Sequence, residues 1–560
     1  MSTSSSQLPS VHTRVVPPAR QLVQPPRRVA LGILLLVIVL FGLIRYRLRD
    51  MPLERDEGEY AYSGQLLLQG IPPYKLAYNM KLPGIYVAYA AIMAVFGETP
   101  AGTHLGLLLV NAASVVLMYL LTSLVFGRLA GLIAGCSYAL LSTSTSVMGF
   151  EAHATNFVVL PALAGIVLVV VAADSHRISL ISLSGICSGL AFLMKQHGIF
   201  FVLFCLLYLC WRAARQFRSP LPAMRDGTIF AAGAILPYAV TCLLLYRAGV
   251  FHTFWFWTVS YAGEYSKIGL RRAIHAFLEN SARVVMPAVL VWIVAVVGIT
   301  ALWWDRDVSR HRFFALALFL LSFLSICPGA YFRPHYFVLV LPVVAMLTGI
   351  AVSSTTKRLA ENPGRRFAVV PILLFMLALG YSIATQRRDY FSLAPESVFQ
   401  ATYPDDPFLA AKAVADYVRQ HSSPSARIAV IGSEPEIYFY AHRRSATGYI
   451  YMYSLIGHQK YLASMQEQML RELHENQPEY LVYVDVWNSW GDRSHAREAT
   501  AFLQSLNDFM NSQYERVGVA DLDPATQYIW GDAARTYVPK SPSSIYVLKR
   551  RIAEHPGVLS

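Results

Sequence analysis

The sequence predicts an α-helical membrane domain that crosses the bilayer many times, followed by a soluble α/β domain. Hydrophobic residues make up 55% of the chain and charged residues only 14%, a balance too apolar for an ordinary soluble protein. The apolar residues are clustered in long runs over residues 29–381, each close to the ~20 residues that cross a bilayer. After residue 386 the composition becomes that of a soluble domain.

The chain begins with a segment, residues 1–28, that we expect to be a disordered cytoplasmic tail. This segment is rich in Ser, Pro, Gln and Arg and has too few apolar residues to form a packed core. The run at residues 29–44 has the length of a signal peptide, but it lacks a small-residue cleavage site and three arginines follow it closely. We therefore expect it to be a retained anchor helix.

Further apolar runs extend to residue 384 and bring the prediction to about eleven transmembrane helices over residues 29–384. After the anchor they lie near residues 102–126, 129–141, 157–173, 178–193, 199–211, 227–246, 284–304, 313–327, 336–352 and 367–384. The run at residues 87–96 is too short to cross a bilayer, so we expect it to lie at the membrane interface.

Basic residues between the spans predict the orientation of the chain. If the N-terminal tail is cytoplasmic, every loop that alternates to the inner side is basic, as the positive-inside rule requires. The basic residues of these loops are Arg128, Arg177, Arg212, Arg215, Arg218, Arg225, Arg306, Arg310, Arg312, Lys357, Arg358, Arg365 and Arg366. Three arginines at residues 45–49 oppose the pattern locally. An odd number of spans then places residues 385–560 on the extracytoplasmic side.

The net charge of +13 raises the question of a nucleic-acid partner, because basic patches attract phosphate backbones. Here most of the basic residues lie in short loops between apolar runs, where membrane orientation explains them. We therefore expect membrane lipids as partners and no nucleic acid.

The soluble part of the chain, residues 385–560, shows helix and strand patterns in alternation. Helical periodicity at residues 407–420 and 461–475 alternates with strand-like runs at residues 427–431, 480–484 and 544–549. This alternation predicts an α/β sandwich with a mostly parallel sheet. Neither of the glycine-rich phosphate-binding motifs occurs there, so nucleotide binding is not indicated.

The predicted topology brings ionisable residues from four outer loops to one side of the membrane. Such groups at helix ends that face a shared cavity are costly to keep and indicate a functional site. The candidates are Asp56, Glu57, Tyr60, Lys81, Glu151, His153, Lys195, Arg333 and His335.

Each candidate also has a simpler interpretation. An acidic loop can be merely solvated, Glu151 and His153 can form an interfacial pair, and Lys195 and Arg333 can extend to lipid headgroups. Convergence of acids and cations on one face favours the functional interpretation.

Short motifs in these loops resemble a known family. The motif Arg-Asp-Glu-Gly-Glu-Tyr-Ala at residues 55–61, followed by Lys-Leu-Pro at 81–83, resembles the first outer loop of bacterial aminoarabinose and protein O-mannosyl transferases. These are family 39-type members of the GT-C superfamily of polyprenyl-phosphate-sugar glycosyltransferases. Their loop has an Asp-Glu pair and then Lys-Pro-Pro, so Leu82 departs from the pattern.

The resemblance extends over most of residues 29–550. It includes His153 and Asn156 with the following Pro161, Arg-Pro-His-Tyr-Phe at residues 333–337, and Ile-Gly-Ser-Glu-Pro-Glu-Ile-Tyr-Phe at residues 431–439. It implies a GT-C fold and an enzyme that transfers a sugar from a polyprenyl-phosphate donor. The acceptor would be an extracytoplasmic lipid, glycan or protein.

The chemistry of such a transfer assigns roles to the candidates. A departing lipid phosphate needs positive charge, which Lys81 and Arg333 can supply. The acceptor hydroxyl needs a base, for which Asp56 is suited, while Glu57 or Glu151 could position the acceptor or hold a divalent metal ion. One displacement through an oxocarbenium-like transition state would invert the anomeric centre.

The remaining candidates, Tyr60, His153, Lys195 and His335, are expected around the donor. No cofactor is required by this scheme, although a divalent metal ion could take part.

Two other classes of protein compete with this interpretation. A transporter or lipid flippase needs ionisable residues at mid-membrane depth and often has broken, symmetry-related helices. Pro161, Pro237 and Pro342 could mark such breaks, but the sequence shows no internal repeat. A non-catalytic assembly or sensor protein is the third possibility, and the intact acidic pair counts against it.

Overall fold

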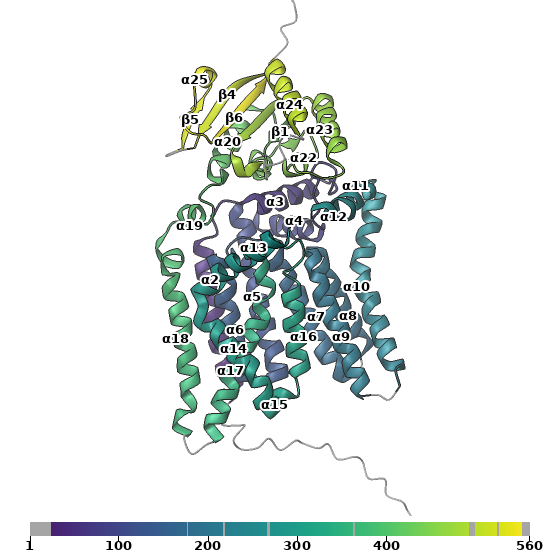
Figure 1. The fold of residues 1–560 in the computed structure, drawn as a ribbon, viewed down its shortest axis with the longest axis vertical. Coiled ribbons are helices and arrows are strands. Elements are labelled where there is room, and N and C mark those ends of the chain that lie inside the picture. Colours follow the sequence, from purple (N-terminus) through teal and green to yellow (C-terminus); the bar gives the residue numbers. More distant parts are fainter. Residues whose placement is uncertain are drawn as a thin grey trace, which may run out of the picture.

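A computed structural model of the chain describes residues 24–175, 177–216, 219–265, 269–361, 365–491, 499–522 and 526–551. Of the tail predicted for residues 1–28, residues 1–23 lie outside these ranges. In the described residues, a bundle of long helices carries a smaller layer of strands and helices at one end (Figure 1).

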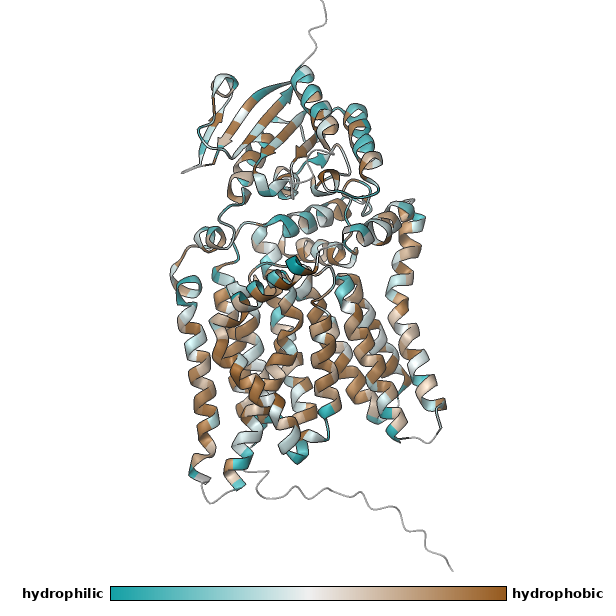
Figure 2. Ribbon diagram, viewed as in Figure 1, coloured by the Kyte–Doolittle hydropathy of each residue, from teal (hydrophilic) through white to brown (hydrophobic). Residues whose placement is uncertain are grey.

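A helix occupies each of the predicted spans. These helices are α2 (Arg27–Arg47), α5 (Pro100–Phe126), α6 (Arg128–Ser142), α7 (Ala154–Ser175), α8 (Ile178–Met194), α9 (Ile199–Gln216), α10 (Leu221–Arg247), α14 (Val289–Trp304), α16 (Arg312–Leu324), α17 (Leu341–Glu361) and α18 (Val370–Thr385). Among the described residues, seven helical segments are long and apolar enough to cross a membrane, and α6, α8 and α16 are shorter apolar helices. The predicted polytopic helical fold is therefore confirmed, and Figure 2 shows apolar residues along most of the bundle.

The three prolines that could have marked broken helices do not break them. Pro161 and Pro237 lie inside the continuous helices α7 and α10. Pro342 is the second residue of α17, where a missing backbone N–H leaves no intrahelical hydrogen bond unmade. The discontinuous spans expected of many transporters are therefore not found at these positions.

Small residues let neighbouring bundle helices approach closely. A Cβ atom added to Gly185 of α8 would lie 2.2 Å from the Phe230 carbonyl oxygen of α10, and one added to Gly349 of α17 would lie 2.2 Å from the Ala130 carbonyl oxygen of α6. Glycine at such contacts is typical of helix packing in membranes. This packing fixes the helix ends from which the outer loops emerge.

A layer of short helices separates the bundle from the sheet (Figure 1). It contains α3 (Arg55–Leu68), α4 (Gly84–Phe96), α11 (Phe251–Trp255), the π-helix η3 (Phe256–Tyr261), α12 (Ala262–Tyr265) and α13 (Leu270–Val285). The run at residues 87–96, predicted to be interfacial, belongs to α4 in this layer. Helix α3 begins with a capping box, in which the Glu54 carboxylate accepts from the Glu57 backbone N–H at 2.9 Å.

The C-terminal sheet region comprises the described residues from 395 to 551. Its strands are β1 (Arg427–Ile431), β2 (Arg444–Ser445), β3 (Tyr480–Asp485), β4 (Tyr514–Asp521), β5 (Gln527–Trp530) and β6 (Ser544–Arg550), in the spatial order β2-β1-β3-β6-β4-β5. Its helices are α19 (Pro395–Thr402), α20 (Phe408–His421), α21 (Glu436–Ala441), α22 (Tyr453–Ile456), α23 (Leu462–Asn476), α24 (Thr500–Gln513) and α25 (Asp532–Thr536).

The expectation of a mostly parallel sheet is wrong. Strand β1 pairs in parallel with β2 and β3, but β6 pairs antiparallel with both β3 and β4, and β4 pairs antiparallel with β5. Parallel neighbours need a long crossover connection, such as the one through α23 between β1 and β3. The short connection from Asp521 to Gln527 permits only antiparallel pairing of β4 with β5.

Candidate active site

A cavity of about 560 Å³ lies where the loops predicted to be on the outer side meet the C-terminal sheet region. Residues from loops far apart in the sequence line it. They include Glu54, Arg55, Asp56, Tyr78, Asn79, Lys81, His153, Lys195, Trp257, Tyr261, Arg333, His335, Tyr336, Asp406, Tyr451, Tyr453 and Asn488. The structure therefore brings the predicted outer loops together around one space.

Asp56 and Lys81 form an ion pair on the wall of this cavity. Lys81 Nζ lies 2.7 Å from Asp56 Oδ1 and 2.6 Å from Glu59 Oε2, so one ammonium is shared by two carboxylates. Asp56 is in the first turn of α3, where the helix dipole also favours negative charge. The side chains of Asp56 and Lys81 are 16% and 22% exposed, so both reach the cavity.

The charges of this pair are fixed by its surroundings. Burial acts to raise the pKa of Asp56, but Lys81, His153 and Arg333 hold it below the ordinary value for aspartate. Burial acts to lower the pKa of Lys81, and the neighbouring Asp56 and Glu59 raise it above its usual value. Asp56 is therefore an ionised carboxylate and Lys81 an ammonium at neutral pH.

Glu57, the second predicted catalytic acid, faces away from the cavity. Its carboxylate is fully buried and accepts hydrogen bonds from the Ala152 backbone N–H at 2.6 Å and from the His104 ring at 3.0 Å. It also takes part in the capping box with Glu54. The structure brings Asp56 to the cavity but not Glu57, which links α3 to α5 and to the loop before α7.

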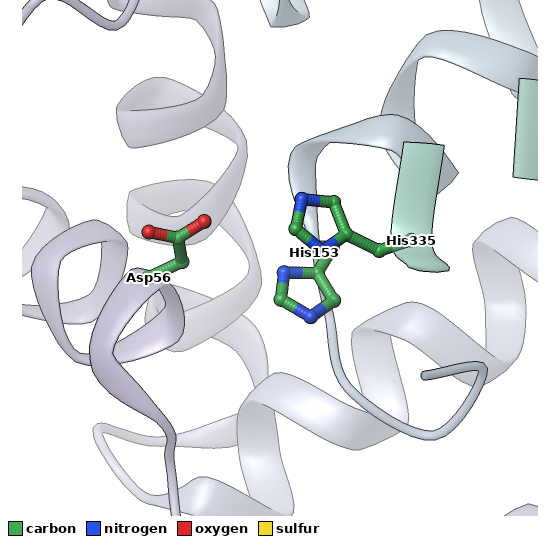
Figure 3. A group of neighbouring side chains, drawn as sticks. All are labelled: Asp56, His153 and His335. Atoms are coloured by element: carbon green, nitrogen blue, oxygen red, sulfur yellow. The ribbon is translucent and has the colours of Figure 1, made fainter. Parts of the chain in front are cut away.

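His153 and His335 stack beside Asp56. Their ring centroids are 4.0 Å apart at an interplanar angle of 15°, and Figure 3 shows the Asp56 carboxylate next to the two rings. Neither ring nitrogen of His153 has a hydrogen-bond partner among the described residues, although Nδ1 lies 3.6 Å from Glu54 Oε1. Burial lowers the pKa of His153 to about 4 and that of His335 well below its ordinary value.

These three residues have the donors of a metal site. One ligand atom from each of Asp56, His153 and His335 lies within 4.8 Å of the others. Neutral imidazoles and a carboxylate suit a divalent transition metal such as Zn²⁺. The unpaired nitrogens of His153 fit this role, because a buried polar atom without a partner is costly.

Lys195 and Arg333 add positive charge to the same cavity. Lys195 caps the C-terminal end of α8, and its Nζ lies 4.2 Å from the centroid of the Tyr336 ring. Burial lowers the pKa of Lys195 to about 7, against the opposing effect of Asp56. The Arg333 guanidinium lies 5.5 Å from the Tyr331 ring centroid. Both predicted cations are thus placed where an anionic substrate could meet them.

Tyr60 and Glu151 lie behind the cavity wall. The Tyr60 ring centroid is 4.6 Å from Lys81 Nζ, and the ring is 1% exposed. Glu151 is 2% exposed, and burial together with the nearby Glu57 raises its pKa to about 7. Neither residue lines the cavity, so the structure gives them no direct contact with a substrate.

Several residues at or behind the cavity wall were not predicted as site residues. Glu59, which lies behind the wall, follows Asp56 by three positions, so the two lie on one face of α3, and this helical spacing could have identified it. Tyr451, Asp406 and Asn488 come from the C-terminal sheet region. No local pattern connects these with the first loop.

Comparisons with known proteins agree with the predicted resemblance. Residues 81–240 match the family described as dolichyl-phosphate-mannose-protein mannosyltransferase. A search of curated proteins finds no significant match to the chain.

Solved structures with similar folds cover most of the chain. ArnT from Cupriavidus metallidurans bound to undecaprenyl phosphate is 14% identical with a TM-score of 0.57, and the match covers 94% of this chain and 99% of that chain. Apo ArnT is 16% identical, with a TM-score of 0.54 and coverage of 81% and 93%.

The Archaeoglobus fulgidus oligosaccharyltransferase tethered with an acceptor peptide is 14% identical, with a TM-score of 0.53 and coverage of 90% and 74%. Identities this low show a shared fold, which is the GT-C fold.

Proposed function

We propose that this chain, a membrane protein with the GT-C fold, is a glycosyltransferase that transfers a sugar from a polyprenyl-phosphate donor to an extracytoplasmic acceptor. One observation carries the proposal. An ionised Asp56 and the cations Lys81, Lys195 and Arg333 line a single cavity between the outer loops and the C-terminal sheet region. The name of the matching family and the undecaprenyl phosphate bound by ArnT support a lipid-linked donor.

The cations of the cavity are suited to the donor phosphate. Lys81 is held in the wall by ion pairs with both Asp56 and Glu59. Lys195 and Arg333 bring further positive charge to the cavity. Preorganised charge of this kind stabilises the negative charge that develops on a leaving phosphate, and each such contact is worth several kcal/mol.

Asp56 is placed to act as the base. Its low pKa keeps it ionised, and its carboxylate, which lines the cavity, can accept the proton of an acceptor hydroxyl during attack on the anomeric carbon. The sugar–phosphate bond breaks through an oxocarbenium-like transition state, and the phosphate departs toward the cations. A single displacement of this kind inverts the anomeric centre.

A divalent metal ion is compatible with the same cavity. Asp56, His153 and His335 would hold it, and its positive charge would add to that of the lysines beside the substrate phosphate. Because the pKa values of His153 and His335 are lowered, both imidazoles are neutral at pH 7 and would bind the ion without first losing a proton.

The alternative of a transporter or lipid flippase has less support. It needs ionisable groups at mid-membrane depth. Asp56 instead belongs to α3, which lies in the layer of short helices at one end of the bundle (Figure 1), and Lys81 lies in the connection between α3 and α4 of the same layer.

The test is transfer by purified protein in lipid nanodiscs, supplied with a panel of polyprenyl-phosphate sugars and with lipid, glycan and peptide acceptors. We expect release of polyprenyl phosphate that depends on an acceptor, with assays run both with and without a chelator. Movement of intact donor across vesicles, with no transfer for any donor, would instead support the flippase.

A further inference from the structure

Glu59 is a buried carboxylate that the proposed reaction does not use directly. Its side chain is 0% exposed and its two oxygens accept from four donors. Oε1 accepts from the Tyr86 hydroxyl at 2.6 Å. Oε2 accepts from Lys81 Nζ at 2.6 Å, from Asn79 Nδ2 at 2.8 Å and from the Tyr451 hydroxyl at 2.9 Å. Both oxygens of this carboxylate accept hydrogen bonds, from donors on four different residues, so the group is held in one position.

The two carboxylates that share Lys81 differ in access to the cavity. Asp56 lines the cavity and is 16% exposed, whereas Glu59 is sealed behind the wall. Glu59 therefore cannot touch a substrate and is not a candidate base. It holds one side of the Lys81 ammonium and leaves Asp56 to hold the side that faces the cavity.

The fourth donor to Glu59 comes from the C-terminal sheet region. Tyr451 lies between β2 and α22, and its hydroxyl also lies 3.1 Å from the Arg55 carbonyl oxygen. Its ring centroid is 5.6 Å from Lys81 Nζ. A residue of the sheet region thus contacts Glu59 through its hydroxyl group and lies close to Lys81.

Close packing fixes the sheet region against α3. A Cβ atom added to Gly58 would lie 2.6 Å from the Glu436 backbone nitrogen, so only glycine permits this approach. The neighbouring Arg55 donates to the Ser433 carbonyl oxygen at 2.6 Å and to Glu434 Oε1 at 3.0 Å. This contact determines where Tyr451 lies relative to Glu59.

We infer that Glu59 is a positioning residue for Lys81, and that the C-terminal sheet region sets this position through the Tyr451 hydroxyl. The inference rests on the proposed function, since it assumes that Lys81 acts on the donor phosphate. The sheet region would then be part of the reaction centre, because docking it on α3 completes the set of donors around Glu59. Loss of one donor would leave Lys81 held less firmly as the phosphate departs.

The ionisation of Glu59 provides a readout of this arrangement. The titratable groups around it are Lys81, Asp56 and the tyrosines at 60, 74, 86 and 451. Burial raises the pKa of Glu59, and its contacts with Lys81 and Tyr86 oppose the rise. Hydrogen bonds favour the charged form, so removing the Tyr451 hydroxyl raises this pKa further.

The test is the pH dependence of transfer by the full-length Tyr451→Phe protein, with Tyr449→Phe as the matched control. Tyr449 lies in the same segment and loses a hydroxyl contact of similar length, 3.0 Å to Gln468, but it does not line the cavity. Because Lys81 needs an ionised Glu59, activity is lost as pH falls through the pKa of Glu59. We expect Tyr451→Phe to move this acid limb to higher pH and to lower kcat by about 3- to 10-fold, the range for one lost hydrogen bond.

A second variant and the activity of the parent protein distinguish failure of this inference from failure of the proposed function. Glu59→Gln should lower kcat by roughly 10- to 100-fold, as expected for loss of a hydrogen bond to a charged group, with a smaller change in the KM of the donor. If the Glu59→Gln protein does not fold, the pH profile of Tyr451→Phe still tests the positioning role of Glu59. A Tyr451→Phe profile that matches Tyr449→Phe, in an active parent, overturns the positioning role alone. A parent protein inactive with every donor overturns the proposed function and this inference with it.

Discussion

Asp56 and Glu57 are adjacent in sequence, but their side chains lie in different environments. Successive residues of a helix point about 100° apart, so the first turn of α3 directs one carboxylate into the cavity and the other into the protein. Asp56 meets Lys81 and the histidines, while Glu57 meets His104 and the Ala152 backbone N–H. The difference makes the two residues separable by mutation.

We expect mutation of Asp56 to reduce turnover and mutation of Glu57 to reduce stability. Asp56→Asn should fold and bind donor normally while turnover falls by roughly 10²-fold or more, because an amide cannot accept the proton. Glu57→Ala should lower the melting temperature, because it leaves the buried Ala152 N–H without its acceptor.

Steady-state kinetics and thermal unfolding of both variants distinguish the effects. Glu57→Gln, which retains an acceptor oxygen, is the control for Glu57→Ala. Near-normal transfer by a well-folded Asp56→Asn protein would remove Asp56 from the role of base.

The narrow space around Lys81 leads to a prediction about cation type. Lys81 Nζ fits between two carboxylate oxygens at 2.6 and 2.7 Å, a site for a compact ammonium and not for the planar fork of arginine. We expect Lys81→Arg and Lys81→Gln both to lose activity, and Arg333→Lys to be impaired, in donor KM or in turnover at saturating acceptor. Full activity of Lys81→Arg would overturn the assignment of Lys81 to the donor phosphate.

Lys195 should make donor binding depend on pH. Burial lowers its pKa to about 7, so the empty cavity loses this positive charge as pH rises through 7. A polyprenyl-phosphate sugar is a phosphodiester whose own charge stays constant in this range, and we expect its Kd to increase from pH 6 to pH 8.5. Lys195→Met should bind more weakly at pH 6 and show little change with pH. An unchanged pH dependence in Lys195→Met would assign the titration to another group.

At the scale of elements, the contact between α3 and α21 depends on one glycine. A methyl group at residue 58 would meet Glu436 backbone atoms 2.6 Å away, and backbone yields less than a flexible side chain. We expect Gly58→Ala to lower the free energy of unfolding by about 1–3 kcal/mol, as is usual for overpacking, and to lower activity with it.

Gly32→Ala in α2 is the matched control, because no atom lies within 4 Å of its added Cβ. It should keep or raise stability, since alanine favours a helix. Equal melting temperatures for the two variants would show that α3 does not need this close approach.

The elements that could be predicted are those with a strong local pattern. Spans in the bundle were predictable because each buries an apolar run of suitable length in lipid. Strands β1, β3 and β6 were predictable from their apolar residues. Strand β5 (Gln527–Trp530) was missed because it is only four residues long, and its residues are half-buried or exposed at the edge of the sheet. The antiparallel pairing of β6 with two strands depends on long-range contacts that a local pattern does not report.

At the scale of the whole molecule, the cavity is formed by parts that only the fold brings together. The hydrogen bond from Tyr451 to Glu59 joins residues 392 positions apart. The first loop could be recognised from its motif, but the tyrosine and asparagine side chains of the sheet region have no spacing that links them to it. The candidate site was therefore predictable for the loops of the bundle and not for the wall supplied by the sheet region.

The two ends of the bundle bear on the predicted orientation of the molecule in the membrane. Helix α15 (Arg306–Ser309) and the C-terminal end of α17 lie at the end away from the C-terminal sheet region (Figure 1). Both belong to loops predicted to be cytoplasmic because they are basic. Lys357 is 3.3 Å from Asp305, but Arg306 and Arg310 remain exposed at this end. The cavity and the sheet region would then lie together on the opposite, extracytoplasmic side.

We therefore predict that alkaline phosphatase fused after Ser560 is active in a bacterial host, because this enzyme needs the oxidising environment outside the cytoplasm to form its disulfides. The same reporter fused after Arg310 should be inactive, and a cytoplasmic reporter such as a fluorescent protein should show the reverse at both positions. The Arg310 fusion controls for expression and insertion of the preceding spans. An active cytoplasmic reporter after Ser560 would place the cavity on the inner side, where the donor would have to be supplied from the cytoplasmic leaflet.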